Sequence, residues 1–272
     1  MRLNFLLKET LRPVYNYINN KNYREFMRLY NKYGKFERYK RVNEVKFLNY
    51  IINVPDLPSF IWQFKEIFVD EIYKFESSSD APIIYDCGAN IGISALFFKK
   101  LFPKAKIKAF EADPQIASIL KSNLQKNNIN DVEVIEKAVW INYEGIYFGV
   151  EGADGGSIYK TNDRKIIVES IKLKDFIDAE SKIDFLKMDI EGSEFEVIKD
   201  CDKSLGKVKN IFIEYHSFRN MQQKLSEILK ILEANNFRYY LQNVTYKKYP
   251  FMSNNEILEM DFQINIFGSK DD

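Results

Sequence analysis

The chain has 272 residues, 46% of them hydrophobic, and a net charge of +1, which are ordinary values for a globular protein. This composition excludes a largely disordered chain, and the N-terminal apolar run, broken by Lys8 and Glu9, is too short to span a bilayer. The two cysteines, Cys87 and Cys201, have neither metal-ligand spacing nor a disulfide-dense pattern. We therefore expect a reduced, cytoplasmic protein with no transmembrane segment and no export signal.

The first part of the chain is basic. Residues 1–46 contain twelve Lys or Arg and four Glu, a net charge of +8, which leaves −7 for the remainder. This segment is either a solvated helical face or a surface for an anionic partner. We expect residues 1–79 to form a mostly helical N-terminal segment that includes a helix over 60–75. A polar linker then leads into the main domain, residues 80–272.

The main domain opens with a strand, a turn and a helix. Ile83 to Tyr85 reads as a buried strand, and a helix begins at Ile93. Between them, Gly88, Asn90 and Gly92 form a turn in which glycine permits positive φ and close approach of a ligand to the backbone. The free N–H groups at the start of the helix favour binding of a nucleotide-like molecule.

Strands and helices then alternate. Asp113 followed by Pro114 is typical of a helix start. The expected strands are 106–110, 132–135, 183–188 and 211–214, followed by an antiparallel pair at 238–241 and 262–267 across a loop with Pro250; the expected helices begin near residues 114, 194 and 223. This alternation predicts an α/β fold with a parallel sheet covered on both faces.

Acidic residues follow four of these strands. Because ligands of open α/β sheets bind beyond the carboxyl ends of the strands, we expect Asp86, Glu111, Asp189 and Glu214 to approach one cleft. Glu111 follows the glycine turn by roughly twenty residues, where a dinucleotide fold places the carboxylate that binds ribose hydroxyls. Asp86 would repel phosphates and suits a cationic ligand. These residues favour S-adenosylmethionine over a dinucleotide, and glycines that serve only tight packing remain an alternative.

Five motifs in this order resemble one family, the FkbM-type S-adenosylmethionine-dependent methyltransferases. They are Asp86-Cys-Gly-Ala-Asn-Ile-Gly92, Phe110-Glu-Ala-Asp-Pro114, Lys137-Ala-Val139, Glu151-Gly-Ala-Asp-Gly-Gly156 and Lys187-Met-Asp-Ile-Glu-Gly-Ser-Glu194. The resemblance runs from about residue 64 to residue 267. It implies the class I methyltransferase (Rossmann-like) fold, with a mostly parallel seven-stranded sheet, and methylation of hydroxyl groups on sugars or natural products.

The resemblance also implies roles for residues. Asp86, Gly88, Asn90 and Gly92 would surround the methionine part of the cofactor, and Glu111 would bind its ribose. Ala112 would contact the cofactor, Asp113 and Ala138 would lie by the adenine, and Asp189 would face the methyl group. The glycine-rich loop over 151–157 would close over the substrate or form only a tight turn.

Methylation of a hydroxyl group requires an aligned nucleophile and removal of its proton. Period-2 alternation places Phe212, Glu214 and His216 on one face of a strand, so an acid and the only histidine lie together at its end. We predict His216, Asp189 and Glu214 as catalytic residues. A Mg²⁺ ion held by Asp189, Glu191 and Glu214 is an alternative, and we predict no metal site.

Three classes of function remain. The favoured one is an S-adenosylmethionine-dependent O-methyltransferase acting on a hydroxyl of a saccharide or related small molecule, with an anionic acceptor as one option. A nucleic-acid methyltransferase would use the basic N-terminus, but base-amino methylation generally shows an Asn/Asp-Pro-Pro-aromatic motif where this chain has Asp189-Ile-Glu-Gly. A non-catalytic binding module is the third class. The sequence does not define the oligomeric state.

Overall fold

A seven-stranded sheet forms the centre of the protein in the computed structural model, which describes residues 13–149, 165–219, 221–245, 247, 249, 251–252 and 260–271. Its strands are β3 (Ile83–Cys87), β4 (Lys106–Phe110), β5 (Val132–Ile135), β10 (Ile183–Met188), β11 (Val208–Phe218), β12 (Arg238–Asn243) and β13 (Met260–Ser269). They are ordered β12-β13-β11-β10-β3-β4-β5. β13 alone runs opposite to the direction of the other six strands, so the expected mostly parallel, seven-stranded sheet is confirmed.

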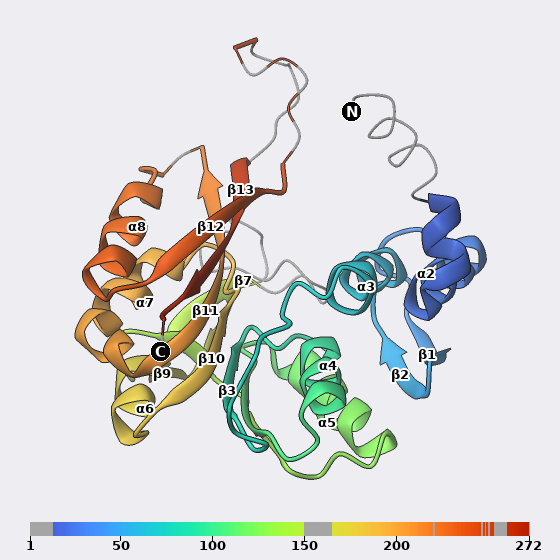
Figure 1. The fold of residues 1–272 in the computed structure, drawn as a ribbon, viewed down its shortest axis with the longest axis horizontal. Helices are drawn as coiled ribbons and strands as arrows, with labels where there is room; N and C mark the ends of the chain where they lie inside the picture. The colour runs from blue at the N-terminus through green and yellow to red at the C-terminus, as the bar shows by residue number, and fades with distance from the viewer. Residues whose placement is uncertain are drawn as a thin grey trace.

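Helices cover both faces of this sheet (Figure 1). One face packs on α4 (Ile93–Leu101) and α5 (Pro114–Lys126); the other packs on α6 (Leu173–Ala179), α7 (Glu194–Cys201), the 3₁₀ helix η2 (Asp202–Lys207) and α8 (Leu225–Ala234). Successive side chains of each strand point into two separate hydrophobic cores. Ile84 and Phe185 belong to the first core, and Tyr85 and Leu186 belong to the second. Burial of both faces explains the continuous apolar runs of these strands.

The N-terminal segment contains a hairpin that the sequence did not predict. After α2 (Lys21–Tyr33), the strands β1 (Val42–Phe47) and β2 (Tyr50–Val54) pair antiparallel. The expectation that residues 1–79 are mostly helical is therefore wrong for 42–54. Val45 and Phe47 are buried at alternate positions of β1, so the period is that of a half-buried strand.

The helix expected over 60–75 is also shorter in the structure. It comprises α3 (Leu57–Phe64) and a π-helical turn, η1 (Lys65–Val69). Beyond η1 the chain turns at Glu71, whose φ of 52° is left-handed, and then runs to β3. This turn directs Tyr73 toward the sheet, where its ring packs against Phe212 at a centroid distance of 4.9 Å.

The hairpin attaches to α5 through amide side chains. Asn123 accepts a hydrogen bond from the N–H of Asn53 and donates to its carbonyl, and Asn127 makes the same pair of bonds with Ile51. These asparagines form hydrogen bonds with backbone N–H and C=O groups at the free edge of β2, much as a neighbouring strand would. The N-terminal segment also shares one hydrophobic core with α4 and the sheet, while the boundary near residue 80 stays a prediction.

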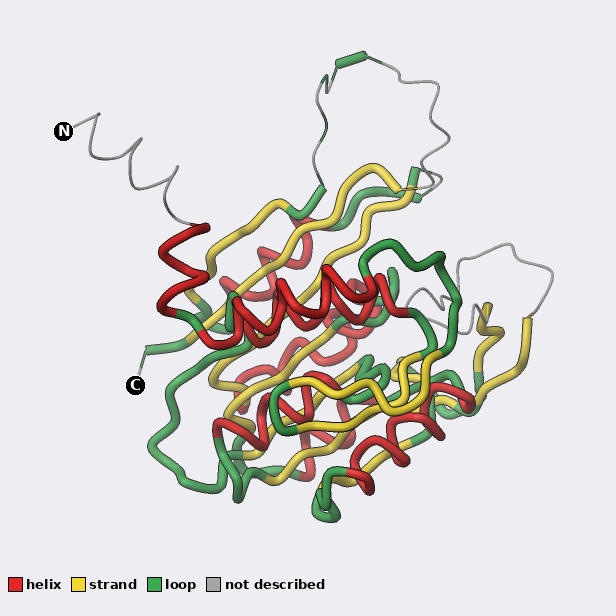
Figure 2. The backbone as a smooth tube through the Cα atoms, turned by 90° about the vertical axis from the view of Figure 1, so that its right-hand side faces the viewer, coloured by secondary structure: helices red, strands yellow, loops and turns green. Residues whose placement is uncertain are grey.

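Two small strand pairs lie beyond β5. β6 (Ala138–Trp140) pairs parallel with β9 (Ser170–Lys172), and β7 (Ile146–Gly149) pairs antiparallel with β8 (Lys165–Val168). The chain between β7 and β8, including the glycine-rich loop, lies outside the described residues, as does Pro250. Among the helices described, none has the length and apolar character that a membrane crossing requires. Figure 2 looks from the side on which Figure 1 shows α2 and α3, so the strands of the sheet run across the view with helices overlapping them.

Candidate active site

The glycine turn lies where the strand order reverses, between β3 and β10. Gly88 has a φ of 81°, and a Cβ atom there would lie 1.8 Å from the carbonyl oxygen of Asp189. Only glycine therefore fits this position. Gly92 is the N-cap of α4 with a φ of 92°, and Asn90 is also left-handed. The turn thus brings bare backbone and a helix start to the site where open α/β sheets bind ligands.

A cleft of about 630 Å³ opens at this end of the sheet. Five of the predicted residues line it: Gly88, Asn90, Asp189, Glu214 and His216. Its opposite wall comes from the N-terminal segment, through Arg38, Pro58, Ser59, Trp62, Gln63, Glu66, Ile67 and Tyr73. The N-terminal segment is therefore part of the candidate site, although no motif in the sequence indicated this role.

Lys187 links the strand ends beneath the cleft. Its Nζ atom lies 3.4 Å from a carboxylate oxygen of Asp86 and 3.4 Å from one of Asp189, and it donates to the carbonyl of Gly88 at 2.8 Å. Burial alone would lower the pKa of Lys187, but the carboxylates of Asp189, Asp86 and Glu214 outweigh it and raise the pKa. The ammonium group is thus a permanent positive charge at the floor of the cleft.

Asp86 does not reach the cleft surface. It is completely buried, and its Oδ2 atom accepts a short hydrogen bond from Ser94 at the start of α4. Its other oxygen has Lys187 as an ion-pair partner and no hydrogen bond within the described residues. Asp86 therefore acts on the cleft through Lys187 and the glycine turn.

Glu111 lies on the other side of the turn and does not line this cleft. Its carboxylate accepts hydrogen bonds from the N–H groups of Asn90 at 2.8 Å and Asp113 at 2.9 Å. Burial raises the pKa of Glu111 to about 7, although these bonds oppose the rise. The four strand-end acids therefore do not share one cleft, because the turn separates Glu111 from Asp189 and Glu214.

The residues expected near the adenine lie beside Glu111. Asp113 caps α5 by accepting from the N–H groups of Gln115 and Ile116, as the sequence predicted. Ala112 and Ala138 belong to one small apolar cluster next to β8. The structure thus divides the predicted cofactor residues between the cleft and this neighbouring surface.

His216 is held by a carboxylate other than the one that the sequence suggested. Its Nδ1 atom lies 3.0 Å from Glu194, whereas its Nε2 atom is 3.8 Å from Glu191 and 4.0 Å from Glu214. Burial alone would lower the pKa of His216, but Glu194, Glu191 and Asp189 outweigh it and raise the pKa. Glu194 also accepts from the N–H group of Gly192, so it orders the turn as well.

Three side chains could hold a metal ion. Asp189, Glu214 and His216 offer ligand atoms within 4.8 Å of one another. In this group His216 takes the place of Glu191, the third ligand in the metal site considered from the sequence. Burial raises the pKa of Glu214 well above its usual value, and the charge of Asp189 adds to the rise. The ammonium group of Lys187 already compensates charge beside Asp189.

Sequence reasoning missed the N-terminal wall of the cleft, including three of its larger side chains. Trp62, Glu66 and Tyr73 line it, and all three precede the first motif. A signal existed for the first two, because Ser59, Trp62 and Glu66 recur at helical spacing opposite the apolar face of α3 and η1. Tyr73 carried no such signal, since the turn at Glu71 alone directs it inward.

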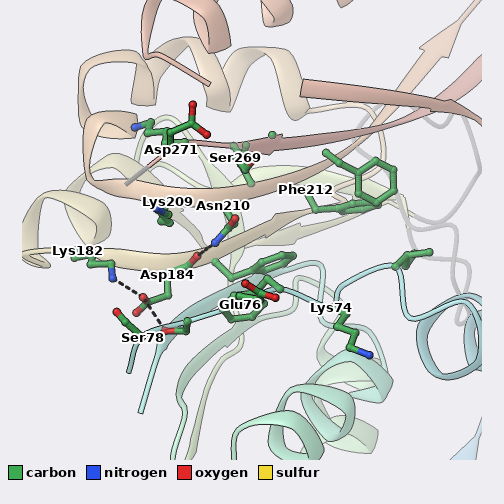
Figure 3. Close-up of a pocket in the computed structure, with 18 residues that line it drawn as sticks. Lys74, Glu76, Ser78, Lys182, Asp184, Lys209, Asn210, Phe212, Ser269 and Asp271 are labelled. Atoms are coloured by element: carbon green, nitrogen blue, oxygen red, sulfur yellow. Dashed lines mark hydrogen bonds and ion pairs between the residues drawn. The ribbon is translucent and has the colours of Figure 1, made fainter. Parts of the chain in front are cut away.

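A second pocket, of about 670 Å³, lies near the amino ends of β10 and β11 (Figure 3). Its polar residues pair among themselves: Lys182 lies 2.8 Å from Asp184, and Asn210 donates to the Asp184 carbonyl. None of the predicted site residues lines it. It is slightly larger than the cleft, but it lies at the wrong end of the strands for the predicted chemistry.

The strand order, the glycine turn and the strand-end acids together define the class I methyltransferase fold. Residues 86–239, more than half of the chain, match the methyltransferase FkbM domain family. The chain belongs to this family and is an S-adenosylmethionine-dependent methyltransferase.

Several known proteins with related sequences are named methyltransferases. Methyltransferase sdnD of Sordaria araneosa is 28% identical over 61% of this chain and 79% of its own length. The 2-O-methyltransferase NoeI of Sinorhizobium fredii (strain NBRC 101917 / NGR234) is 30% identical over 49% of this chain and 63% of its own length. A crystal structure of methyltransferase FkbM from Methylobacillus flagellatus KT aligns over 73% of this chain and 46% of that one, at 18% identity and a TM-score of 0.47.

Proposed function

We propose that this methyltransferase transfers the methyl group to a hydroxyl of a sugar, glycan or related small molecule. The observation that carries the proposal is the buried histidine at the carboxyl end of β11, held by Glu194 on one nitrogen and directed toward the cleft with the other. A hydroxyl group must lose its proton during methyl transfer, and an imidazole fixed in this way suits that task.

The residues at the turn fit S-adenosylmethionine. Gly88 and Asn90 bring backbone to the edge of the cleft, and Asp189 provides negative charge for a cationic group. When bound, the cofactor supplies a methyl carbon whose bond to sulfur breaks, with the electron pair left on sulfur, as the acceptor oxygen forms its own bond. We assign Gly88, Asn90 and Gly92 to the methionine part, with Asp86 supporting them from beneath through Lys187, and Glu111, Ala112, Asp113 and Ala138 to the adenosine part.

The proton passes to His216. Glu194 accepts a hydrogen bond from the Nδ1–H group of His216, which fixes the tautomer of the imidazole. The Nε2 atom is then left to take the proton from the substrate hydroxyl. Asp189 and Glu214 border the same space and align the acceptor by hydrogen bonding to its other hydroxyl groups. Proton transfer to a positioned base is typically worth roughly 10²–10⁴-fold in rate.

The name of one relative supports an oxygen acceptor, because NoeI is called a 2-O-methyltransferase. The acidic lining of the cleft disfavours a nucleic-acid substrate, since carboxylates such as Asp189 would repel phosphates.

A labelled methyl donor tests the proposal. The purified protein is incubated with S-adenosylmethionine carrying a ¹³C-methyl group and a panel of glycosides, amines and oligonucleotides. NMR then distinguishes O-methyl from N-methyl products, and we expect O-methyl signals from glycosides. Label found only on amines or nucleic acid would contradict the proposal. The same assay with a chelator and added Mg²⁺ decides whether transfer needs a metal.

A further inference from the structure

The wall that the N-terminal segment contributes to the cleft has the features of a binding surface. Trp62 on α3 is 53% exposed and lines the cleft, while its ring is backed by Phe26 at a centroid distance of 6.0 Å. A large aromatic ring that is supported behind and open in front is a stacking platform.

Glu66 stands one turn further along the same wall. Within the described residues its carboxylate has no hydrogen bond and no ion-pair partner, yet it is half-buried. Burial raises its pKa, although Lys65 opposes the rise, and the charge of Asp189 on the facing wall adds to it. A half-buried carboxylate without a partner is costly unless a ligand supplies a donor.

Tyr73 is 3% exposed, and its hydroxyl has no hydrogen bond within the described part of the chain. Burial raises its pKa well above the usual value, and the charges of Asp189, Glu214 and others act in the same direction. The neutral hydroxyl group therefore keeps its proton and offers a hydrogen bond to a ligand in the cleft.

The side chains that line the cleft also determine which ligand charge it accepts. Each cationic side chain of the cleft is already matched by a carboxylate behind it: Arg38 by Asp56 at 2.6 Å, Lys187 by Asp86 at 3.4 Å, and His216 by Glu194 at 3.0 Å. Four acids also line the cleft: Glu66, Asp189, Glu191 and Glu214. An anionic ligand would meet cations that are already paired with carboxylates, and the charge of Asp189 would repel it.

We propose that Trp62, Glu66 and Tyr73 form the acceptor subsite and that it takes an uncharged or amino-bearing sugar ring and rejects anionic ones. The ring stacks on Trp62, its hydroxyl or ammonium groups donate to Glu66, and one of its oxygen atoms accepts from the Tyr73 hydroxyl. This inference rests on the proposed function, and it names the acceptor class. It differs from the option of an anionic acceptor that the basic N-terminal sequence offered.

Three matched probes test the charge preference: methyl glucoside, methyl glucosaminide and methyl glucuronide. Binding is measured by saturation-transfer NMR in the presence of S-adenosylhomocysteine, which requires no turnover. We expect the glucoside and glucosaminide to bind at least about tenfold more tightly than the glucuronide, because like charges in a cleft cost substantial affinity. Equal or tighter binding of the glucuronide, or binding of none of the probes, overturns the subsite.

Two variants locate the subsite. Trp62→Ala should weaken glucoside binding about 3- to 10-fold, the size expected for loss of an aromatic stacking contact, with cofactor affinity unchanged. Tyr240→Ala removes an aromatic side chain of similar exposure from β12, away from the cleft, and should change neither. Equal effects of these two variants would overturn the assignment.

Glu66→Gln should reduce the difference in binding affinity between the glucoside and the glucuronide. Glu133→Gln on β5 should leave this difference unchanged. An effect of Glu66→Gln confined to cofactor affinity would assign Glu66 to the cofactor and overturn its place in the subsite. The two proposals fail separately, because methylation of glycosides without any charge preference contradicts only this one. Methyl transfer to amines or nucleic acid alone contradicts the proposed function.

Discussion

The Nδ1 atom of His216 lies 3.0 Å from the Oε1 atom of Glu194, and this contact joins the end of β11 to the first residue of α7. Because the carboxylates of Glu194, Glu191 and Asp189 outweigh the effect of burial, the pKa of His216 is raised. A raised histidine pKa adds stability that is fully present below the unfolded-state pKa and is lost as pH rises through the folded-state pKa.

His216 is the only histidine in the chain, so an NMR titration of its imidazole needs no assignment. We expect a midpoint above the usual value near 6.5. Glu194→Gln should lower the midpoint, because it removes the main negative charge that stabilises the protonated imidazole. Glu227→Gln on α8 should leave the midpoint unchanged. A midpoint near 6.5 that is unaffected by Glu194→Gln would contradict the role given to this contact.

The same contact predicts the pH dependence of activity. A base must be unprotonated, so a raised pKa means that turnover increases with pH into the alkaline range. Glu194→Gln should move this ascending limb to lower pH. His216→Gln should lower turnover roughly 10²–10⁴-fold while leaving cofactor affinity nearly unchanged. Unchanged turnover in His216→Gln would remove His216 from the mechanism.

Glu111 should make cofactor affinity depend on pH. Burial raises its pKa to about 7, so the carboxylate that accepts hydrogen bonds is lost as pH falls below 7. We expect calorimetry to measure weaker binding of S-adenosylmethionine at pH 6 than at pH 8. Glu111→Gln should bind roughly 10- to 100-fold more weakly at pH 8, with little pH dependence, since bonds to charged groups contribute about 1.5–3 kcal/mol.

Glu111 should also affect the free energy of unfolding. A carboxyl group with a raised pKa gives stability at low pH that is lost as pH rises from about 4.5 to about 7. Denaturant unfolding at pH 5 and pH 8 measures how much the free energy of unfolding falls between these two values. We expect this fall to be smaller in Glu111→Gln than in the parent protein. An equal loss in both proteins would show that the group titrates normally in the folded state.

Local patterns were sufficient to predict the sheet. The strand at Ile83 and the helix start at Asp113 were confirmed, because apolar runs and capping residues act over a few neighbouring positions. The hairpin was missed, since its turn places Leu48 at a φ of 47°, a conformation for which leucine gives no sequence signal. Polar residues at alternate positions of β1 resembled the solvated side of a helix.

The site was predicted in part for a similar reason. Period-2 alternation correctly placed Glu214 and His216 together, because it depends on one strand alone. The contact between Glu194 and His216 joins two elements, and Tyr73 reaches the cleft only through a turn that no motif announced. Contacts of this kind depend on tertiary packing and leave no periodic signal in the sequence.

Gly88 is expected to tolerate no side chain. An alanine there would place its Cβ atom 1.8 Å from the Asp189 carbonyl oxygen and hold a left-handed φ of 81°. We expect Gly88→Ala to lower the free energy of unfolding by about 2–5 kcal/mol, from strain and overpacking together, and to impair cofactor binding. Gly206→Ala is the control, because no atom lies within 4 Å of its Cβ position. Similar stability of the two variants would contradict the close approach of β3 and β10.

Lys187 tests whether buried charges hold the floor of the cleft together. Its ammonium group is 3.4 Å from the fully buried carboxylate of Asp86. Lys187→Met should lower the free energy of unfolding by about 3–5 kcal/mol, because it leaves that carboxylate uncompensated. Adding Asp86→Asn should recover part of this loss, so the double variant is less destabilised than the sum of the single ones.

The exposed pair of Lys104 and Asp80 is the control for this cycle. These two groups are closer, at 2.7 Å, but both side chains are more than 70% exposed. Water screens such a pair, so Lys104→Met should change the free energy of unfolding by less than about 1 kcal/mol, with little coupling to Asp80→Asn. If the two cycles gave equal coupling energies, burial would not be the reason for the effect of Lys187, and its contribution to the cleft would have to come from its hydrogen bond to Gly88 instead.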